Sequence, residues 1–396
     1  MDEYTGDQTP ASIWLSYSFT RAVTPALQRQ FLLHYPDPKD LAKLLRSPHS
    51  PILTNDNTFN QVARAALRQR QAPKVAEQVQ TALDWEQKSS TNHIIGLDHP
   101  AYPQALLATR NAPPVLYVSG NTNCLSTPCV AIVGARKATH GALEQARGIA
   151  QSLAKSGITV VSGLALGIDA AAHRGALLGH GDTIAVSATG PERIYPRSHQ
   201  RLAQEIVSSG AIVTEFPLES SLQPHCFPRR NRLISGMSIG VLVVEAALPS
   251  GTLTTAQHAL RQGREVMAMP GAVQNPMARG CHELLRNGAA LIENANDIMA
   301  CLSTELQRHL VDISAADAVV DEPPIKKKLA NMPSDTLTLL DCLGFDPVSI
   351  DTLVRRTGLD AARVSGALTH LELTGVIVAD HGGRYIRCKQ SKQAPR

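Results

Sequence analysis

Basic residues and small polar residues flank one short apolar run in the second half of the chain. Three arginines and an asparagine precede the run in the segment Phe227-Pro-Arg-Arg-Asn-Arg232, and the turn Ser250-Gly-Thr252 follows it. The run itself, residues 239–245, predicts a strand at the centre of a parallel sheet. Anions bind at the carboxyl ends of such strands, where turn amides and helix N-termini meet. The residues supply positive charge and N–H donors but no obvious nucleophile, so they favour holding a phosphodiester chain over cleaving it.

Other predicted strands also end in small-residue loops. The loops are Gly134-Ala-Arg136, Ser162-Gly-Leu-Ala-Leu-Gly167, Thr189-Gly190, Thr214-Glu-Phe-Pro217 and Pro270-Gly271. Loops that follow the strands of one parallel sheet emerge on the same edge, so we expect all of them to converge with the Ser250 turn. The arginines that adjoin these loops are Arg136, Arg197, Arg229, Arg230, Arg232 and Arg279. So many cations favour an anion-binding edge over a set of unrelated packing turns.

Strand and helix patterns alternate from Cys129 onward, which predicts an α/β fold with an extended Rossmann-like parallel sheet. The predicted strands are Val130–Val133, Thr159–Val161, Thr183–Val186, Ala211–Thr214, Gly240–Glu245, Glu265–Ala268 and Ala290–Ile292. Predicted helices between them include Ala142–Lys155 and Leu202–Ser208, each followed closely by a glycine.

The rest of the chain predicts two accessory domains. Residues 1–92 are expected to form a small helical domain, and residues 93–305 the Rossmann-like domain. A charged and proline-containing linker is expected over 306–330. Three helical patterns followed by a glycine hairpin predict a winged-helix domain over 331–390. Its function stays open between DNA contact and protein docking.

Composition limits the possible partners. The 396 residues carry a formal net charge of only +4, so a nucleic-acid surface must be local, and with 4% aromatic residues it cannot consist mainly of stacking platforms. No signal peptide or membrane-length apolar run is visible, and the seven cysteines show no disulfide spacing. We therefore expect a cytoplasmic protein with reduced thiols and no membrane association. His225-Cys226 and Cys281-His282 lack the spacing of zinc ligands, so no metal is expected.

Familiar enzyme motifs are missing. The turn after the first parallel strand has Arg136 where a dinucleotide-binding loop needs its second glycine, and the chain contains no Gly-Lys dipeptide for a Walker A loop. The acidic residues of the sheet domain lie on separate loops, whereas a metal-dependent nuclease needs a cluster. Asp169 is expected to cap a helix and Glu245 to pair with a nearby arginine. We predict no catalytic residue and no cofactor.

Residues 95–300 resemble the bacterial DNA-processing protein A (DprA/Smf) family. The resemblance lies in the order and spacing of its motifs, namely Gly134-Ala-Arg136, Ser162-Gly-Leu-Ala-Leu-Gly-Ile-Asp169, Tyr195-Pro196, Phe227-Pro-Arg-Arg-Asn-Arg232, Val243-Val-Glu-Ala246, Ser250-Gly-Thr-Leu-Thr-Thr-Ala256, Gly263-Arg264, Pro270-Gly271 and Gly280-Cys-His282. One departure is the loop Ser187-Ala-Thr-Gly-Pro-Glu192, where the family usually has Leu-Gly-x-Gly-Leu-Asp.

The resemblance implies a protein that binds single-stranded DNA, protects it during natural transformation and loads RecA recombinase onto it. It also implies a homodimer formed through the Rossmann-like domain. The expected DNA contacts are Gly134, Arg136, Lys137, Ser162, Gly163, Arg197, Arg229, Arg230, Asn231, Arg232, Ser250, Gly251, Thr252 and Arg279.

Two alternatives stay open. The resemblance extends to nucleoside-monophosphate phosphoribohydrolases, whose motif carries a catalytic glutamate. Thr255 occupies that position here, which disfavours hydrolysis. A nucleotide-sensing module with the winged helix as its output is the second alternative.

Overall fold

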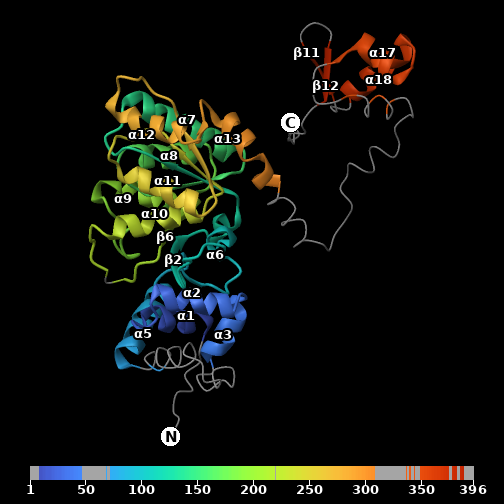
Figure 1. The fold of residues 1–396 in the computed structure, drawn as a ribbon. Coiled ribbons are helices and arrows are strands. Elements are labelled where there is room, and N and C mark those ends of the chain that lie inside the picture. The colour runs from blue at the N-terminus through green and yellow to red at the C-terminus, as the bar shows by residue number, and fades with distance from the viewer. Residues whose placement is uncertain are drawn as a thin grey trace. The chain divides into compact units, whose positions relative to one another are not determined.

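The computed structural model describes residues 9–46, 72–218, 220–307, 348–373, 377–380 and 384–387, together with residues 68, 336, 339 and 343 (Figure 1). The chain divides into two compact units, Met1–Asp312 and Ile313–Arg396. In the described ranges, no helix has both the length and the hydropathy needed to cross a membrane.

A nine-stranded sheet forms the centre of the first unit, in the order β1-β2-β6-β5-β4-β3-β7-β8-β9. Strands β3 to β9 are parallel to one another, and β2 and β1 extend the β6 edge in antiparallel pairing. The strands are β1 (Asn92–Gly96), β2 (Val115–Gly120), β3 (Cys129–Val133), β4 (Thr159–Ser162), β5 (Thr183–Val186), β6 (Ala211–Thr214), β7 (Gly240–Val243), β8 (Glu265–Ala268) and β9 (Ala290–Leu291).

Helices cover both faces of this sheet. Val130 and Ile132 of β3 belong to the apolar core shared with α7, α8 and α13, whereas Ala131 and Val133 belong to the core shared with α10 and α11. Strands β3 to β7 are buried at every position, as expected for parallel strands with both faces covered. The helices of this layer are α6 (Gln104–Leu107), α7 (His140–Lys155), α8 (Ile168–Leu178), α9 (Gln200–Ser209), α10 (Cys226–Gly236), α11 (Gly251–Arg261), α12 (Arg279–Arg286) and α13 (Ala295–Cys301).

The predicted α/β fold with a mostly parallel sheet is confirmed. The third, fourth and sixth predicted strands, 183–186, 211–214 and 265–268, have the observed bounds. Two features differ from the expectation. Strand β1 was missed, and the predicted strand 240–245 ends at Val243, which leaves Val244 and Glu245 in the loop that follows.

The strand order reverses between β3 and β7. The chain leaves β3 toward β4, β5 and β6 and then returns through α10 to β7 on the other side of β3. The loops after β3 and β7 therefore diverge from neighbouring strands and leave a crevice between them. In open α/β sheets this topological switch point is where ligands bind.

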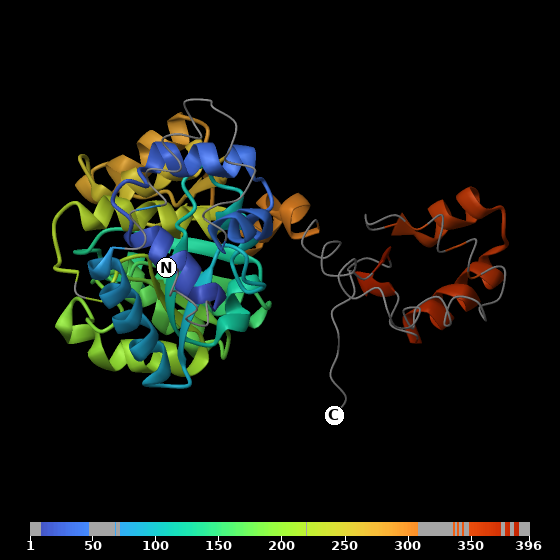
Figure 2. The same cartoon turned by 90° about the horizontal axis from the view of Figure 1, so that it is seen from below.

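The N-terminal helices α1 (Pro10–Phe19), α2 (Pro25–His34), α3 (Pro38–Arg46) and α5 (Pro73–Gln87) pack at the β1 edge of the first unit (Figure 2). The Trp14 indole is fully buried and donates to Asp98 Oδ1, and the Trp85 ring packs edge-on against Tyr117 of β2 at 5.7 Å. The predicted boundary at residue 92 falls inside this compact unit.

The second unit contains the predicted winged-helix domain. Its described elements are β10 (Val348–Ser349), α17 (Ile350–Thr357), α18 (Ala361–Leu373), β11 (Ile377–Asp380) and β12 (Arg384–Arg387). The strands form an antiparallel sheet in the order β10-β12-β11, packed with the helices around Leu353, Leu368 and Ile377. The first of its three predicted helical patterns covers residues 335–343, of which only 336, 339 and 343 are described.

Replacing Gly96 of β1 by alanine should destabilise the first unit. An added Cβ would overlap the indole ring of Trp14, which is fully buried and cannot move aside. Overpacking of this kind costs about 1–3 kcal/mol. Thermal unfolding followed by tryptophan fluorescence measures the loss. Gly141→Ala in α7 is the matched control, because open space surrounds its Cβ position. A wild-type melting temperature for Gly96→Ala would contradict the described docking of α1 on β1.

Candidate nucleic-acid interface

A pocket of about 360 Å³ lies at the topological switch point; we call it the switch-point pocket. Its walls come from the loops after β3, β4 and β7 and from the first turns of α10 and α11. The lining residues are Val133, Gly134, Ala135, Arg136, Ala165, Asp169, Phe227, Pro228, Arg230, Asn231, Ile234, Pro249, Ser250, Gly251, Thr252, Thr254 and Thr255. Of the loops predicted to converge, those at residues 134–136, 162–167 and 250–252 line this pocket. The other predicted loops do not line it.

The N-terminus of α11 forms one wall. Ser250 is the N-cap residue, and its hydroxyl accepts the Thr252 N–H at 3.1 Å. The Thr252 hydroxyl donates to the Gly134 carbonyl at 3.1 Å, which ties the loop after β7 to the loop after β3. Gly251 is exposed with open space around its Cβ position. The first-turn N–H groups of a helix have no intrahelical acceptor, so this wall offers donors to an anion.

Arg136 is the accessible cation of the pocket. Its side chain is exposed, and its guanidinium lies over the Phe227 ring at 5.1 Å from the ring centroid. Among the residues that the structure describes, no carboxylate lies within ion-pairing distance of it. The adjacent Lys137 is also exposed. The stacked ring restrains the guanidinium without neutralising it, so the charge remains available to a ligand.

Arg230 has a different role, because it is buried in the wall with 5% of its surface exposed. Its guanidinium donates to the Gly163 carbonyl after β4 and, at 2.6 Å, to the Val186 carbonyl of β5. Burial lowers its pKa to about 10, opposed by the charge of Asp169 and reinforced by that of Arg136. Most of the hydrogen bonds that Arg230 can donate are therefore made within the protein itself.

Asp169 completes this buried arrangement. We expected it to cap its own helix, but Gly167 is the N-cap of α8. The Asp169 carboxylate instead accepts the Gly163 N–H at 3.1 Å and the Ala165 N–H at 3.4 Å. Burial raises its pKa, and the charge of Arg230 opposes that shift. Gly163 must be glycine, because an added Cβ would lie 2.6 Å from the Arg230 guanidinium carbon.

Asn231, in the middle of α10, connects this helix to the N-terminal part of α11. Its side-chain oxygen accepts from Arg230 Nε at 3.1 Å, and its amide nitrogen donates to Thr254 Oγ1 of α11 at 3.1 Å. A longer bond of 3.4 Å reaches the Gly251 carbonyl. Asn231 therefore fixes α10 against α11 and holds the pocket walls at a set separation.

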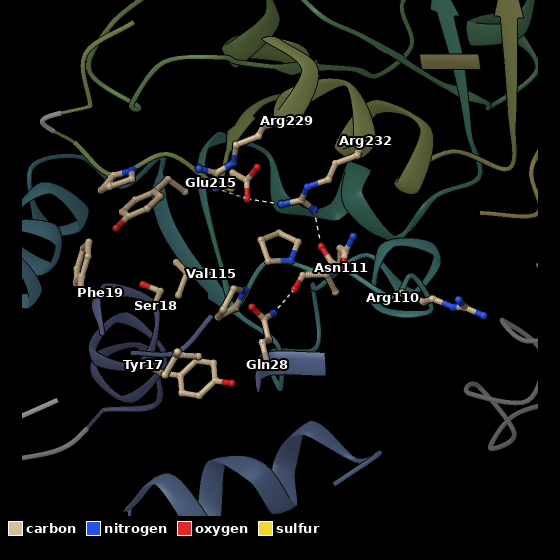
Figure 3. A pocket seen from close by; sticks show the side chains of 16 residues that line it. Tyr17, Ser18, Phe19, Gln28, Arg110, Asn111, Val115, Glu215, Arg229 and Arg232 are labelled. Atoms are coloured by element: carbon tan, nitrogen blue, oxygen red, sulfur yellow. Dashed lines mark hydrogen bonds and ion pairs between the residues drawn. The ribbon is translucent and has the colours of Figure 1, made fainter. Parts of the chain in front are cut away.

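Arg229 and Arg232 lie on the opposite face of α10, away from the switch-point pocket. Both guanidiniums contact Glu215 Oε2, Arg229 at 3.4 Å, and Arg232 also donates to the Asn111 carbonyl (Figure 3). The Arg229 side chain is 56% exposed and lies over Phe216, whereas that of Arg232 is 17% exposed. They line a second pocket, between α10 and the N-terminal helices.

The remaining predicted contacts do not line the switch-point pocket. Ser162 is fully buried, and its hydroxyl donates to the Ile132 carbonyl at 2.6 Å inside the sheet. Arg197 begins the short helix η4 (Arg197–His199) and Arg279 begins α12; both are exposed. The structure therefore brings together Gly134, Arg136, Arg230, Asn231, Ser250, Gly251 and Thr252 and leaves the other predicted residues around them.

Glu245 does not pair with an arginine, contrary to our expectation. Its carboxylate accepts the Thr139 N–H at 2.8 Å and the Asn275 amide at 3.1 Å, and so stabilises the start of α7. Of the residues that line the switch-point pocket, Asp169 alone carries a carboxylate. Among the described residues, no three His, Cys, Asp or Glu side chains are grouped so as to hold a metal ion.

Comparison with known proteins adds an independent line of argument. The sequence profile of the family described as DNA recombination-mediator protein A matches residues 93–303, and that of the DprA winged helix domain matches residues 323–383. Protein Smf of Escherichia coli (strain K12) is 39% identical over 314 residues, which is 79% of this chain and 82% of that protein. DNA processing protein DprA of Streptococcus pneumoniae is 40% identical over 200 residues, which cover 50% of this chain and 70% of that protein.

A solved structure of a DNA processing protein A is also similar to this chain. The X-ray structure of DNA processing protein A from Streptococcus pneumoniae superposes with a TM-score of 0.59 and 29% sequence identity, covering 74% of this chain and 98% of that one. Sequence motifs, profile matches and fold agree, and the chain belongs to the DNA-processing protein A (DprA/Smf) family.

Proposed function

We propose that this protein binds single-stranded DNA and holds the phosphate backbone in the switch-point pocket. The observation that carries the proposal is the exposed Arg136 guanidinium, which lies beside the N-terminus of α11 and has no carboxylate partner among the described residues. Its relatives are named DNA processing proteins, which supports a polynucleotide as the ligand. Phosphate groups match both a guanidinium and the N–H donors of a helix start.

The proposal includes no chemical step on the DNA. Thr255 stands where the hydrolase motif has its glutamate and is buried in the pocket wall, with 2% of its surface exposed. Asp169 is tied to two loop amides and faces Arg230, so it is poorly placed to activate water. Binding and transfer of the strand are the functions that this geometry supports.

The proposal also includes two protein partners that the family resemblance implies. One is a second copy of the chain, bound through the Rossmann-like domain. The other is RecA recombinase, which would receive the strand during natural transformation. Strand transfer to a recombinase requires reversible DNA binding, and a shallow site built on phosphate contacts supplies that.

Arg136→Ala should weaken single-strand binding by about 1–3 kcal/mol, the range for charge-assisted hydrogen bonds, without changing the melting temperature. The slope of log affinity against log salt should fall by about one. Fluorescence anisotropy with a labelled single-stranded oligonucleotide across a salt series measures both. Arg201→Ala is the control, because that side chain is 92% exposed on α9 and pairs only with Glu205 among the described residues. Wild-type affinity in Arg136→Ala, or equal affinity for duplex of the same length, would refute the proposed site.

Arg230→Met should lower the stability of the free protein, which Arg136→Ala should leave unchanged. The buried guanidinium joins the loops after β4 and β5 and faces Asp169, so its loss leaves a buried carboxylate without its cation. Removing one member of such a pair costs about 3–5 kcal/mol. Urea unfolding should show the loss in the free protein. Full stability combined with lost DNA binding would mean that Arg230 contacts DNA directly.

RecA loading is tested with the full-length protein. On single-stranded DNA precoated with a single-strand-binding protein, RecA filament assembly should start sooner when this protein is present. Arg136→Ala should reduce that effect at equal protein concentration, because the variant holds the strand more weakly. An unchanged lag in the presence of wild-type protein would rule out RecA loading while leaving single-strand binding in place. Sedimentation equilibrium on the same sample tests the dimer.

A further inference from the structure

The second pocket, drawn in Figure 3, is lined by residues on the other side of α10 from those of the switch-point pocket; we call it the junction pocket. It encloses about 610 Å³ between the end of α1, the segment that leads into β2, and α10. Its apolar walls come from Phe19, Val23 and Val115. Arg229 and Arg232 approach Glu215 from α10 at the opposite wall. The pocket is thus apolar on one side and charged on the other.

Two buried polar atoms of the junction pocket lack hydrogen-bond partners among the described residues. They are Glu215 Oε1 and the Tyr117 hydroxyl. The Glu215 side chain is 5% exposed and Tyr117 is 2% exposed. Burial raises the pKa of Tyr117, so its hydroxyl stays neutral. Leaving such groups without partners costs stability, which a ligand with matching polar atoms would recover.

The positive charges of Arg229 and Arg232 determine which kind of hydrogen-bond donor can approach Glu215 Oε1. The other oxygen of the same carboxylate already contacts both Arg229 and Arg232. A lysine or arginine of a partner protein would bring another cation against these two guanidiniums. A neutral exocyclic amino group on a flat aromatic ring avoids that repulsion, and the faces of the ring can pack against the apolar walls. Nucleobases have this combination, and carboxylates accept from their amino groups.

The position of the pocket connects it with the bound strand. Arg230 and Asn231 of α10 line the switch-point pocket, while Arg229 and Arg232 of the same helical turn line the junction pocket. The width of α10 therefore separates the two pockets, and a strand whose phosphates lie in the first pocket can reach the second by passing around this helix. The exposed Arg229 supplies a cation for the intervening backbone.

We propose that the junction pocket takes one unstacked base of the bound strand, whose amino group donates to Glu215 Oε1. The proposal rests on single-strand binding at the switch-point pocket. Cytosine, adenine and guanine carry an exocyclic amino group, whereas thymine does not. The protein should therefore prefer oligodeoxycytidine to oligothymidine of equal length, by about three- to tenfold for one hydrogen bond.

Three full-length variants test the proposal by anisotropy with labelled oligodeoxycytidine and oligothymidine. Glu215→Gln replaces an acceptor by a group that can also donate to the thymine O4, so the preference should disappear or reverse. Ser18→Trp places a large side chain at an exposed position of the pocket rim and should remove the preference without touching the core. Tyr117→Phe removes a buried hydroxyl that has no partner among the described residues, so its melting temperature should equal or exceed that of the wild type while affinity falls about threefold.

Arg136→Ala separates this proposal from the proposed function. That variant should weaken binding to both oligonucleotides by the same factor and leave their ratio unchanged. If Arg136→Ala weakens binding but wild type does not discriminate, or if Ser18→Trp and Glu215→Gln keep the wild-type ratio, the junction pocket binds no base and the switch-point site stands. If wild type binds neither oligonucleotide, the proposed function is wrong and this inference is wrong with it.

Discussion

The buried Arg230 guanidinium is the interaction on which the rest of the site depends. It joins the loop after β4 to the end of β5, and it lies beside the Asp169 carboxylate, which in turn holds the Gly163 and Ala165 amides. A buried cation is tolerated only when its donors are satisfied and its charge is balanced. Here the loop carbonyls and Asp169 do both. The loops consequently have one geometry, and the first turn of α10 is fixed in the crevice between β3 and β7.

Once Arg230 is fixed, helical periodicity determines which of the two pockets each of the other side chains of α10 faces. Phe227, Asn231 and Ile234 recur at spacings of four and three and face the switch-point pocket. Arg229 and Arg232, three residues apart, face the junction pocket and Glu215. One short basic segment thus supplies a stabilising cation, a connector between helices and two cations for a second pocket. The three arginines of this segment are therefore not equivalent as phosphate contacts, because they do not all lie at the same pocket.

The sequence predicted the parallel strands well, because short apolar runs ended by glycine loops allow few other structures. Strand β1 was missed because Asn92-His-Ile-Ile-Gly96 is short and its pairing partner β2 begins 19 residues further along the chain. The separate environments of Arg230 and Arg232 could not be predicted either. They depend on carbonyls and a carboxylate contributed by β4, β5 and the loop after β6, and an arginine is ordinarily expected at the surface. The spacing of these arginines could have indicated their separation, because residues 229 and 232 share one face of a helix and residue 230 does not. That inference required the segment to be assigned to a helix first.

These environments also bear on the proposal that a chain of nearly balanced charge binds a polyanion. Glu215 offsets Arg229 and Arg232, and Asp169 offsets Arg230, so most of the local positive charge is compensated within the fold. Among the described residues that line the switch-point pocket, the cation without a carboxylate partner is Arg136 on its aromatic support, and it lies beside the backbone donors of α11. The compensated cations preserve the shape of the pockets, and the Arg136 guanidinium and the oriented amides are the groups proposed to contact phosphate. Under the proposed function, such a site would hold a strand through oriented donors more than through net charge, and binding of this kind is reversible.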